Sequence, residues 1–205
     1  MLHAVIFDVD DTLLHSMADD DRLYRQAIRD VLGEGVRFRE TLADYEHVSD
    51  TGILRQVLAD NRVADAERHF DVIRERFLDA LERHVEQHGP FREIEGAREM
   101  LERVRAAEQY AVALATGCWR RSAELKLRTA GFELDGIPLA TADDAVERVG
   151  IMQHALRSLG SDFASVTYYG DGVWDREACR ALEWTFRPVG AALGGLMAYH
   201  DEFRT

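Results

Sequence analysis

Short apolar runs alternate with helical patterns over most of this chain, and this alternation restricts its fold more than any other feature. The runs are bounded by polar or turn residues, as strands buried on both faces of a sheet are. Four are clear and a fifth is weaker: 2–9, 110–116, 165–170 and 184–190, with 136–141 as the weak one. Helical patterns at 97–107 and 150–160 lie between them. The alternation predicts an α/β fold with a Rossmann-like, three-layer core around a parallel sheet.

Residues 16–89 depart from this alternation because only helical patterns occur there. Apolar side chains recur at helical spacing in three stretches, which end near Gly33, near Leu58 and near Gly89. We therefore expect an α/β core domain made from residues 1–15 and 90–205. An all-helical cap domain, residues 16–89, is inserted into it just after the first strand.

The composition restricts partners and location. With 38 acidic against 25 basic residues, the formal net charge is -13, which argues against nonspecific binding of nucleic acid. Neither a signal-peptide pattern nor an apolar run near the ~20 residues of a membrane span is visible. Cys118 and Cys179 lie far apart and form no disulfide framework. We expect a soluble, cytoplasmic protein; the sequence leaves its oligomeric state open.

The polar residues that directly follow the apolar runs are the candidate site residues. In open α/β sheets, ligands bind at the carboxyl ends of the strands, so these residues are expected to converge. They are Asp8, Asp10 and Asp11; Thr116 and Gly117; Asp143 and Asp144; and Asp171 and Asp175.

The residue types in this set suit phosphoryl transfer. Asp8 and Asp171 would supply the hard oxygen ligands that Mg²⁺ prefers, and the ion would let the carboxylates tolerate one another. Thr116 offers a hydroxyl, and its neighbouring backbone amides offer donors, to a phosphoryl oxygen. One carboxylate could act as the nucleophile and another as the proton donor, a division that covalent phosphoryl transfer requires.

Three motifs carry a family resemblance. DVDDT at 8–12, ATG at 115–117 and GDGVWD at 170–175 each follow an apolar run. In this order they resemble motifs one, two and four of the haloacid dehalogenase-like hydrolases, and the helical insert resembles their helical-cap, phosphoglycolate phosphatase-like subtype. The resemblance implies a five-stranded sheet in the order 5-4-1-2-3. It also implies a Mg²⁺-dependent phosphatase that hydrolyses a small phosphorylated metabolite through an aspartyl-phosphate.

The resemblance assigns roles to the aspartates. Asp8 would be the nucleophile. Asp10 would protonate the leaving alkoxide and then deprotonate the attacking water, while its backbone carbonyl binds Mg²⁺. Asp171 would be a further direct metal ligand, and Asp175 would support the water shell of the metal.

The phosphoryl-binding residues include one departure from the family pattern. Thr116 and the backbone at Gly117 would hold the phosphoryl group. The third motif of the family supplies a basic residue, usually lysine, at the start of the helix before motif four. The sole lysine, Lys126, lies instead after motif two. Arg148 is the substitute that we expect, since arginine can bridge phosphate and carboxylate.

Several residues near the motifs have a structural interpretation as well as a functional one. We expect Asp11 to shape the turn and Cys118 to pack in the protein interior. Asp175 can act as an N-cap of the helix that follows it. The stretch 47–53 is either a substrate-facing loop or a helix N-terminus capped by Ser49 or Asp50.

Related reaction classes are separated by single residues. Asp10 favours a phosphatase over a dehalogenase, which needs no proton donor for its leaving group. A phosphonatase would need a lysine in the insert, and residues 16–89 contain none. A receiver domain would need an aspartate after the run 110–116. A phosphomutase of the same fold and a catalytically degenerate binding protein remain as alternatives.

Overall fold

Five parallel strands form the central sheet in a computed structural model that describes residues 1–160, 162–200 and 202. The strand order is β5-β4-β1-β6-β7. Counted along the chain and read from β7, this is 5-4-1-2-3, the order that the family resemblance implies. The strands are β1 (His3–Phe7), β4 (Tyr110–Ala115), β5 (Leu139–Ala140), β6 (Ser165–Gly170) and β7 (Thr185–Pro188).

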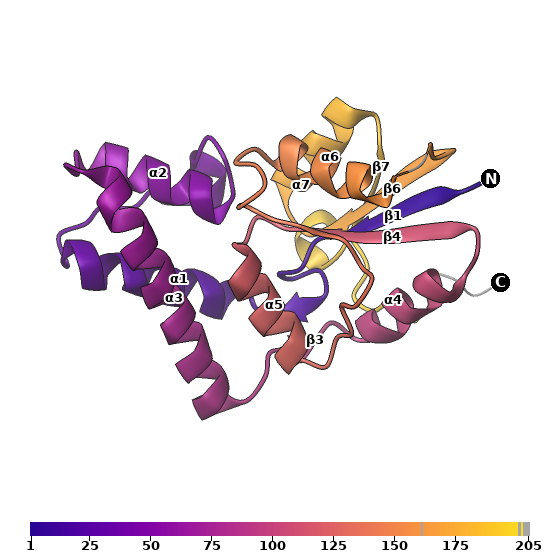
Figure 1. Ribbon diagram of the computed structural model, residues 1–205, viewed down its shortest axis with the longest axis horizontal. Helices are drawn as coiled ribbons and strands as arrows, with labels where there is room; N and C mark the ends of the chain where they lie inside the picture. The colour runs from indigo at the N-terminus through magenta and orange to yellow at the C-terminus, as the bar shows by residue number, and fades with distance from the viewer. Residues whose placement is uncertain (161, 201, 203–205) are drawn as a thin grey trace.

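Helices cover both faces of this sheet, so the predicted three-layer α/β core is confirmed (Figure 1). Strand β1 lies in the middle, between β4 and β6, and its alternate side chains enter two separate hydrophobic clusters. Phe7 packs with α4 (Ala97–Ala106) and α5 (Arg120–Thr129), whereas Ile6 packs with α6 (Arg148–Leu159) and α7 (Val173–Leu182). Burial on both faces explains why β1 is apolar at four successive positions, Ala4 to Phe7.

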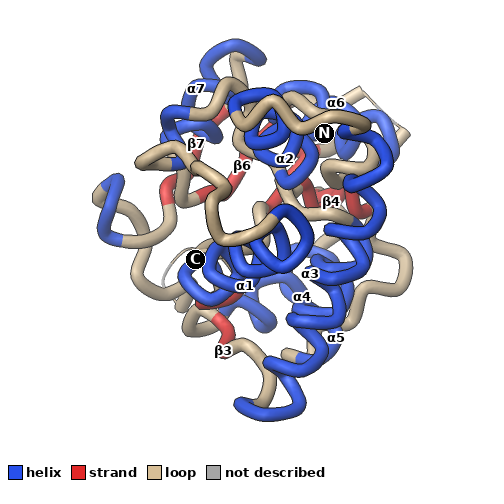
Figure 2. The backbone as a smooth tube through the Cα atoms, turned by 90° about the vertical axis from the view of Figure 1, so that its left-hand side faces the viewer, coloured by secondary structure: helices blue, strands red, loops and turns tan. Residues whose placement is uncertain are grey.

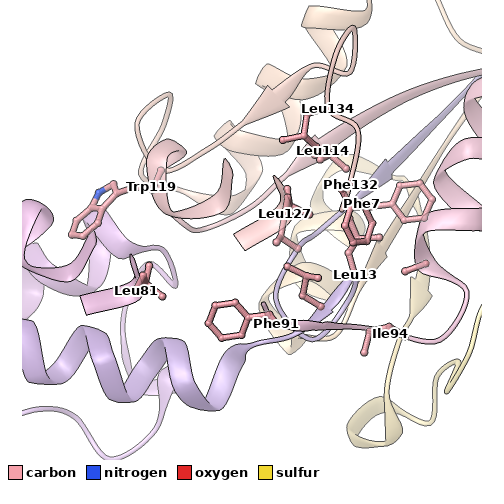
Figure 3. Packing of buried hydrophobic residues seen from close by; sticks show 14 of the residues in the cluster. Phe7, Leu13, Leu81, Phe91, Ile94, Leu114, Trp119, Leu127, Phe132 and Leu134 are labelled. Atoms are coloured by element: carbon pink, nitrogen blue, oxygen red, sulfur yellow. The ribbon is translucent and has the colours of Figure 1, made fainter. Parts of the chain in front are cut away.

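The larger cluster extends from the sheet toward residues 16–89. Figure 3 shows Phe7, Leu127 and Phe132 near the sheet, with Trp119 and Leu81 on the side of the helical segment. The Trp119 ring lies 5.6 Å from the Tyr24 ring, which is itself 5.2 Å from Phe77. Aromatic packing therefore joins the helical segment to the edge of the sheet.

Residues 16–89 form helices and contain no strand among the described residues. They comprise α1 (Met17–Leu32), a short 3₁₀ turn (Leu42–Asp44), α2 (Asp50–Asp60) and α3 (Ala66–His88). These helices lie beyond one end of the sheet, and Figure 2 shows them from that side. Gly33 and Gly89, both at positive φ, end α1 and α3 where the sequence predicted.

Two short strands pair where the chain leaves the core and where it returns. β2 (Leu14–His15) is antiparallel to β3 (Arg92–Glu93). Two-residue strands are too short to produce a sequence pattern, so neither was predicted. The pairing lies next to the predicted boundaries at residues 16 and 89, and the division into core and cap domains stays a prediction.

A 3₁₀ turn (Ala191–Leu193) follows β7 at the edge of the sheet. Within the described residues, no helix is both long enough and apolar enough to cross a membrane.

Candidate active site

The carboxyl end of the sheet gathers the candidate residues from three strands and two helices. Asp8 follows β1, Thr116 follows β4, and Asp171 follows β6. Arg148 is the first residue of α6, and Asp175 lies in the first turn of α7. Parallel strands that end at one edge bring these sequence-distant side chains together.

Three carboxylates form the first of two clusters, which we call the Asp8 cluster. Asp8, Asp171 and Asp175 each place one oxygen within 4.8 Å of the others. Arg148 is the cation beside them: its Nη1 lies 3.5 Å from Asp8 Oδ1, and its Nε lies 3.3 Å from Asp175 Oδ1. The structure therefore places Arg148 beside the Asp8 carboxylate, and its role as the third-motif residue stays a prediction.

The electrostatics of the Asp8 cluster favour an additional cation. Burial raises the pKa of Asp8 to about 7, with Arg148 opposing the shift. Burial and the charge of Asp8 raise the pKa of Asp171 to about 9. Asp171 Oδ1 is buried and makes no hydrogen bond within the described part of the chain. Clustered carboxylate oxygens, one of them unpartnered, fit a hard divalent cation such as Mg²⁺.

The phosphoryl-binding candidates lie beside Arg148. Thr116 is buried, and its Oγ1 accepts a hydrogen bond from the Cys118 backbone amide at 3.3 Å. A Cβ atom at Gly117 would lie 2.9 Å from Arg148 Nη2 and 3.0 Å from the Val48 carbonyl oxygen. Any larger residue would therefore crowd this close approach between the sheet edge and the helical segment.

A second cluster surrounds Lys126, and we call it the Lys126 cluster. Lys126 Nζ donates to Asp10 Oδ1 at 2.6 Å and to Asp20 Oδ1 at 2.5 Å, and lies 3.2 Å from Cys118 Sγ. Ser16 Oγ and Cys118 Sγ also donate to Asp10, at 2.5 and 2.7 Å. All five residues are buried. Both oxygens of the Asp10 carboxylate are therefore bound by donors.

Lys126 already neutralises part of the charge in this cluster. Burial acts to raise the pKa of Asp10, but Lys126, Cys118 and Ser16 together hold it below its usual value. Burial raises the pKa of Asp20 to about 6, with Lys126 opposing the shift. The pKa of Lys126 is raised despite its burial because Asp10 and Asp20 stabilise the ammonium. Although Asp10, Asp20 and Cys118 are close enough to share a metal ion, the ammonium already provides the cation.

The contact between Lys126 and Asp10 was not predicted from the sequence. Lys126 was expected to lie outside the third motif, and the structure agrees that α5, not α6, carries this residue. The available signal was compositional, since one lysine stands among 25 basic residues. Lys126 also lies between the apolar positions Ala123 and Leu127 of the buried face of α5.

Cys118 has a polar contact in addition to its expected packing role. Packing in the interior was the expected role, and the thiol is buried as expected. It also makes a polar contact, because Sγ donates to the Asp10 carboxylate. Burial and the nearby charge of Asp10 raise its pKa well above the usual range, which argues against a thiolate nucleophile.

The acidic residues next to the motifs have structural partners. Asp11 has a φ of 47°, and its Oδ1 accepts hydrogen bonds at 3.2 Å from the backbone amides of Ser16 and Met17 at the start of α1. Asp143 accepts from Arg74 at 2.6 Å, and Asp144 accepts from Arg120 at 2.8 Å. Asp11 therefore shapes the turn, while Asp143 and Asp144 belong to neither cluster.

Two helix starts refine the expectations. Helix α7 begins at Val173, so Asp175 is not its N-cap; Asp175 Oδ2 accepts from the N-cap amide of Gly172 at 3.1 Å. Ser49 caps α2, accepting from Gly52 N at 3.2 Å. The stretch 47–53 also faces a cavity, which Val48, Ser49, Asp50 and Ile53 line together with Asp8 and Thr116.

Several solved structures share this fold. A hydrolase from Pseudomonas syringae superposes with a TM-score of 0.71 at 20% identity, covering 90% of this chain and 83% of its own. CbbY from Rhodobacter sphaeroides in complex with phosphate superposes with a TM-score of 0.70 at 19% identity, covering 100% of this chain and 91% of its own. β-Phosphoglucomutase from Clostridium difficile superposes with a TM-score of 0.71 at 16% identity, covering 93% of this chain and 85% of its own.

The family follows from the sequence itself. The haloacid dehalogenase-like hydrolase family model matches residues 2–183. The chain therefore belongs to the haloacid dehalogenase-like hydrolases, as its three motifs predicted, and it is an enzyme of that class. No curated protein matches the sequence.

Proposed function

We propose that this chain is a Mg²⁺-dependent phosphatase that hydrolyses a small phosphorylated metabolite through an aspartyl-phosphate. The Asp8 cluster carries the proposal. A buried carboxylate lies 3.5 Å from Arg148 and within 4.8 Å of two further carboxylates, one of which has an unpartnered oxygen. This set provides a nucleophile, a fixed positive charge and a cation site at one strand edge.

The first step forms a bond between Asp8 and phosphorus. A carboxylate oxygen of Asp8 attacks the phosphoryl group while the bond between phosphorus and the leaving oxygen breaks. Arg148, Thr116 and the backbone at Gly117 hold the phosphoryl oxygens, and the guanidinium stabilises the negative charge that develops on them. Because both oxygens of Asp10 accept hydrogen bonds here, Asp10 first takes up a proton, with one of those hydrogen bonds given up, and then passes that proton to the leaving oxygen. In later turnovers this proton comes from the attacking water of the second step.

The second step regenerates Asp8. Water attacks the phosphorus of the aspartyl-phosphate, its proton passes to Asp10, and phosphate leaves with the bond to Asp8 broken. The Lys126 cluster suits this step, because Lys126, Ser16 and Cys118 stabilise an ionised Asp10, which is the form that accepts a proton.

Asp8 and Asp171 would hold Mg²⁺ directly, with the Asp10 carbonyl, and Asp175 would support its water shell. When bound, the ion supplies charge neutralisation that lets the ionised Asp8 approach an anionic phosphate. Without it, the raised pKa values of Asp8 and Asp171 favour protonated, non-nucleophilic carboxyls at neutral pH.

The helical segment would act as a cap over this site. Val48 contacts Arg148 through its carbonyl oxygen at 3.2 Å, and Asp50 N donates to the Gly117 carbonyl at 2.7 Å. These contacts hold the helical segment against the site, and the cavity beside Asp8 measures only about 60 Å³, so a small metabolite is the favoured substrate. We also propose a cytoplasmic location, since Cys118 and Cys179 are both free thiols.

Hydrolysis of an aryl phosphate with and without Mg²⁺ tests the proposal. We expect turnover by the wild-type enzyme with Mg²⁺ and background rates with a chelator or in Asp8→Asn. Asp10→Asn should retain weak activity on this ester, because an aryl leaving group needs little protonation. Wild-type turnover no faster than that of Asp8→Asn would refute the phosphatase.

A trapped intermediate gives a second, direct measurement. Mass spectrometry of acid-quenched enzyme should show a phosphoryl adduct on the peptide that contains Asp8. Asp11→Asn is the matched control: it changes a neighbouring carboxylate that binds backbone amides, and it should still form the adduct.

A further inference from the structure

The charge of the cavity wall restricts the alcohol that can leave from the phosphorus. The cavity above Asp8 measures about 60 Å³. Five aspartates line it, and Arg148 is its one basic lining residue. Because Arg148 lies against Asp8 and Asp175, its charge serves the phosphoryl end and not the leaving group.

The wall that residues 16–89 contribute contains three carboxylates, Asp20, Asp21 and Asp50, and otherwise uncharged side chains. Each carboxylate has a partner behind the wall. Asp21 pairs with Arg25 at 2.8 Å, and Asp50 Oδ2 accepts from the Trp119 backbone amide at 2.8 Å.

The net charge of this wall is negative. Asp10 and Asp20 share the single ammonium of Lys126, which leaves one negative charge in that group. The pair between Asp21 and Arg25 is neutral. Asp50 accepts from a backbone amide and pairs with no cation among the described residues; burial and the charge of Asp20 raise its pKa well above the usual value, and a cationic group beside it would favour its ionised form. A carboxylate or second phosphate on the substrate would be desolvated here without a counter-ion, which is costly.

The adjoining cleft has the same character. It measures about 360 Å³ and shares Val48, Arg148 and Trp174 with the cavity. Its other ionisable residues are three glutamates and a histidine, Glu46, Glu147, Glu177 and His47. An approach in which carboxylates outnumber basic groups repels anions and attracts cations over several ångströms.

We propose that the substrate is a small phosphate monoester of an ammonium-bearing alcohol, an amino or quaternary ammonium alcohol. The phosphate binds at Arg148 and the metal site, while the cationic group faces Asp20, Asp21 and Asp50. This inference rests on the proposed phosphatase function and names its substrate class.

Three esters of similar size test the charge directly. With Mg²⁺ present, 2-aminoethyl phosphate, propyl phosphate and carboxymethyl phosphate carry a positive, a neutral and a negative leaving group. We expect kcat/KM to fall in that order, by about tenfold at each step. Equal values for the first and the last, or a preference for carboxymethyl phosphate, would overturn the inference.

The aryl phosphate assay separates the two proposals. Turnover of aryl phosphate without the expected order among the three esters overturns only the substrate class. No turnover of any ester, including the aryl phosphate, overturns the phosphatase and the substrate class together.

Asp21→Asn provides the matched variant. It removes a wall carboxylate and leaves the Arg25 charge unpaired, so the preference for 2-aminoethyl over carboxymethyl phosphate should shrink by about threefold to tenfold. Glu108→Gln makes the same charge change at an exposed residue outside both cavities and should leave the ratio unchanged. An equal effect of the two variants would show that net charge, and not the wall, sets the preference, which overturns the inference.

Discussion

Two carboxylate clusters lie next to each other in this site, and their buried negative charge is neutralised in different ways. The Lys126 cluster contains its own cation, which contacts Asp10 and Asp20 at 2.6 and 2.5 Å. The Asp8 cluster has Arg148 at longer distances, 3.5 and 3.3 Å, and keeps a buried oxygen of Asp171 without a partner among the described residues. The first arrangement is complete as it stands, whereas the second suits an added cation. Proximity of acidic groups alone therefore does not identify a metal site; the nearest cation must also be considered.

The largest effect is expected from removing the cation of the complete cluster. Lys126→Met leaves Asp10 and Asp20 buried without a counter-ion, which should lower the free energy of unfolding by about 3–5 kcal/mol. Urea denaturation measures this loss. Arg128→Met, on the same helix but with a side chain that is 55% exposed, should stay within about 0.5 kcal/mol. Similar losses in both variants would contradict the assignment of Lys126 as a buried counter-ion.

Arg148 tests the other cluster through activity. Arg148→Ala should reduce kcat for aryl phosphate by at least about 10²-fold, because a charge-stabilising donor is lost. Arg148→Lys should recover part of the rate, since lysine is the usual residue of the family at this position, although it lacks the planar fork that reaches both Asp8 and Asp175. An unchanged kcat in Arg148→Ala would assign the third-motif role to another residue.

The pH dependence of stability, measured with and without Mg²⁺, tests the Asp8 cluster. The folded pKa values of Asp8, about 7, and Asp171, about 9, exceed the ordinary aspartate pKa of 3.8, so the folded state binds more protons than the unfolded chain between these limits. The metal-free free energy of unfolding should therefore fall as pH rises from about 4 to about 9. Because a tenfold change in proton affinity corresponds to about 1.4 kcal/mol, a decline of at least that size is expected.

Mg²⁺ provides the comparison for this pH series. Divalent ions bind ionised carboxylates, so Mg²⁺ should reduce the decline, and Asp171→Asn should show a smaller decline than wild type in the absence of the ion. Urea titrations across the pH range with chelator or with Mg²⁺ give both results. Identical pH profiles with and without Mg²⁺ would argue against a cation site at the Asp8 cluster.

Cys118→Ala should have the smallest effect. It removes one donor to Asp10 while Lys126 and Ser16 remain, so we expect a loss of about 1 kcal/mol in the free energy of unfolding. The kcat for aryl phosphate should stay within a few-fold of wild type. Loss of all turnover would instead indicate a nucleophilic thiol.

Much of the fold was predictable because its signals are local. Strand β1 is apolar at successive positions since it is buried on both faces, and glycines end α1 and α3. The candidate site was predictable for a related reason. Residues that directly follow parallel strands lie at the same edge of the sheet, so Asp8, Thr116 and Asp171 converge. By contrast, the pairing of β2 with β3 and the start of α7 depended on a few residues with no periodic pattern.

The sequence by itself determined the α/β class, the helical insert, the family motifs and the strand-end residues, because each depends on the spacing of residues within a short stretch of chain. Only the tertiary structure decided which cation neutralises which carboxylate. Lys126 lies 116 positions from Asp10 along the chain, and Arg148 lies 140 positions from Asp8. Contacts at such separations depend on how helices α5 and α6 pack against opposite faces of the sheet, and no short-range pattern of residues records that packing.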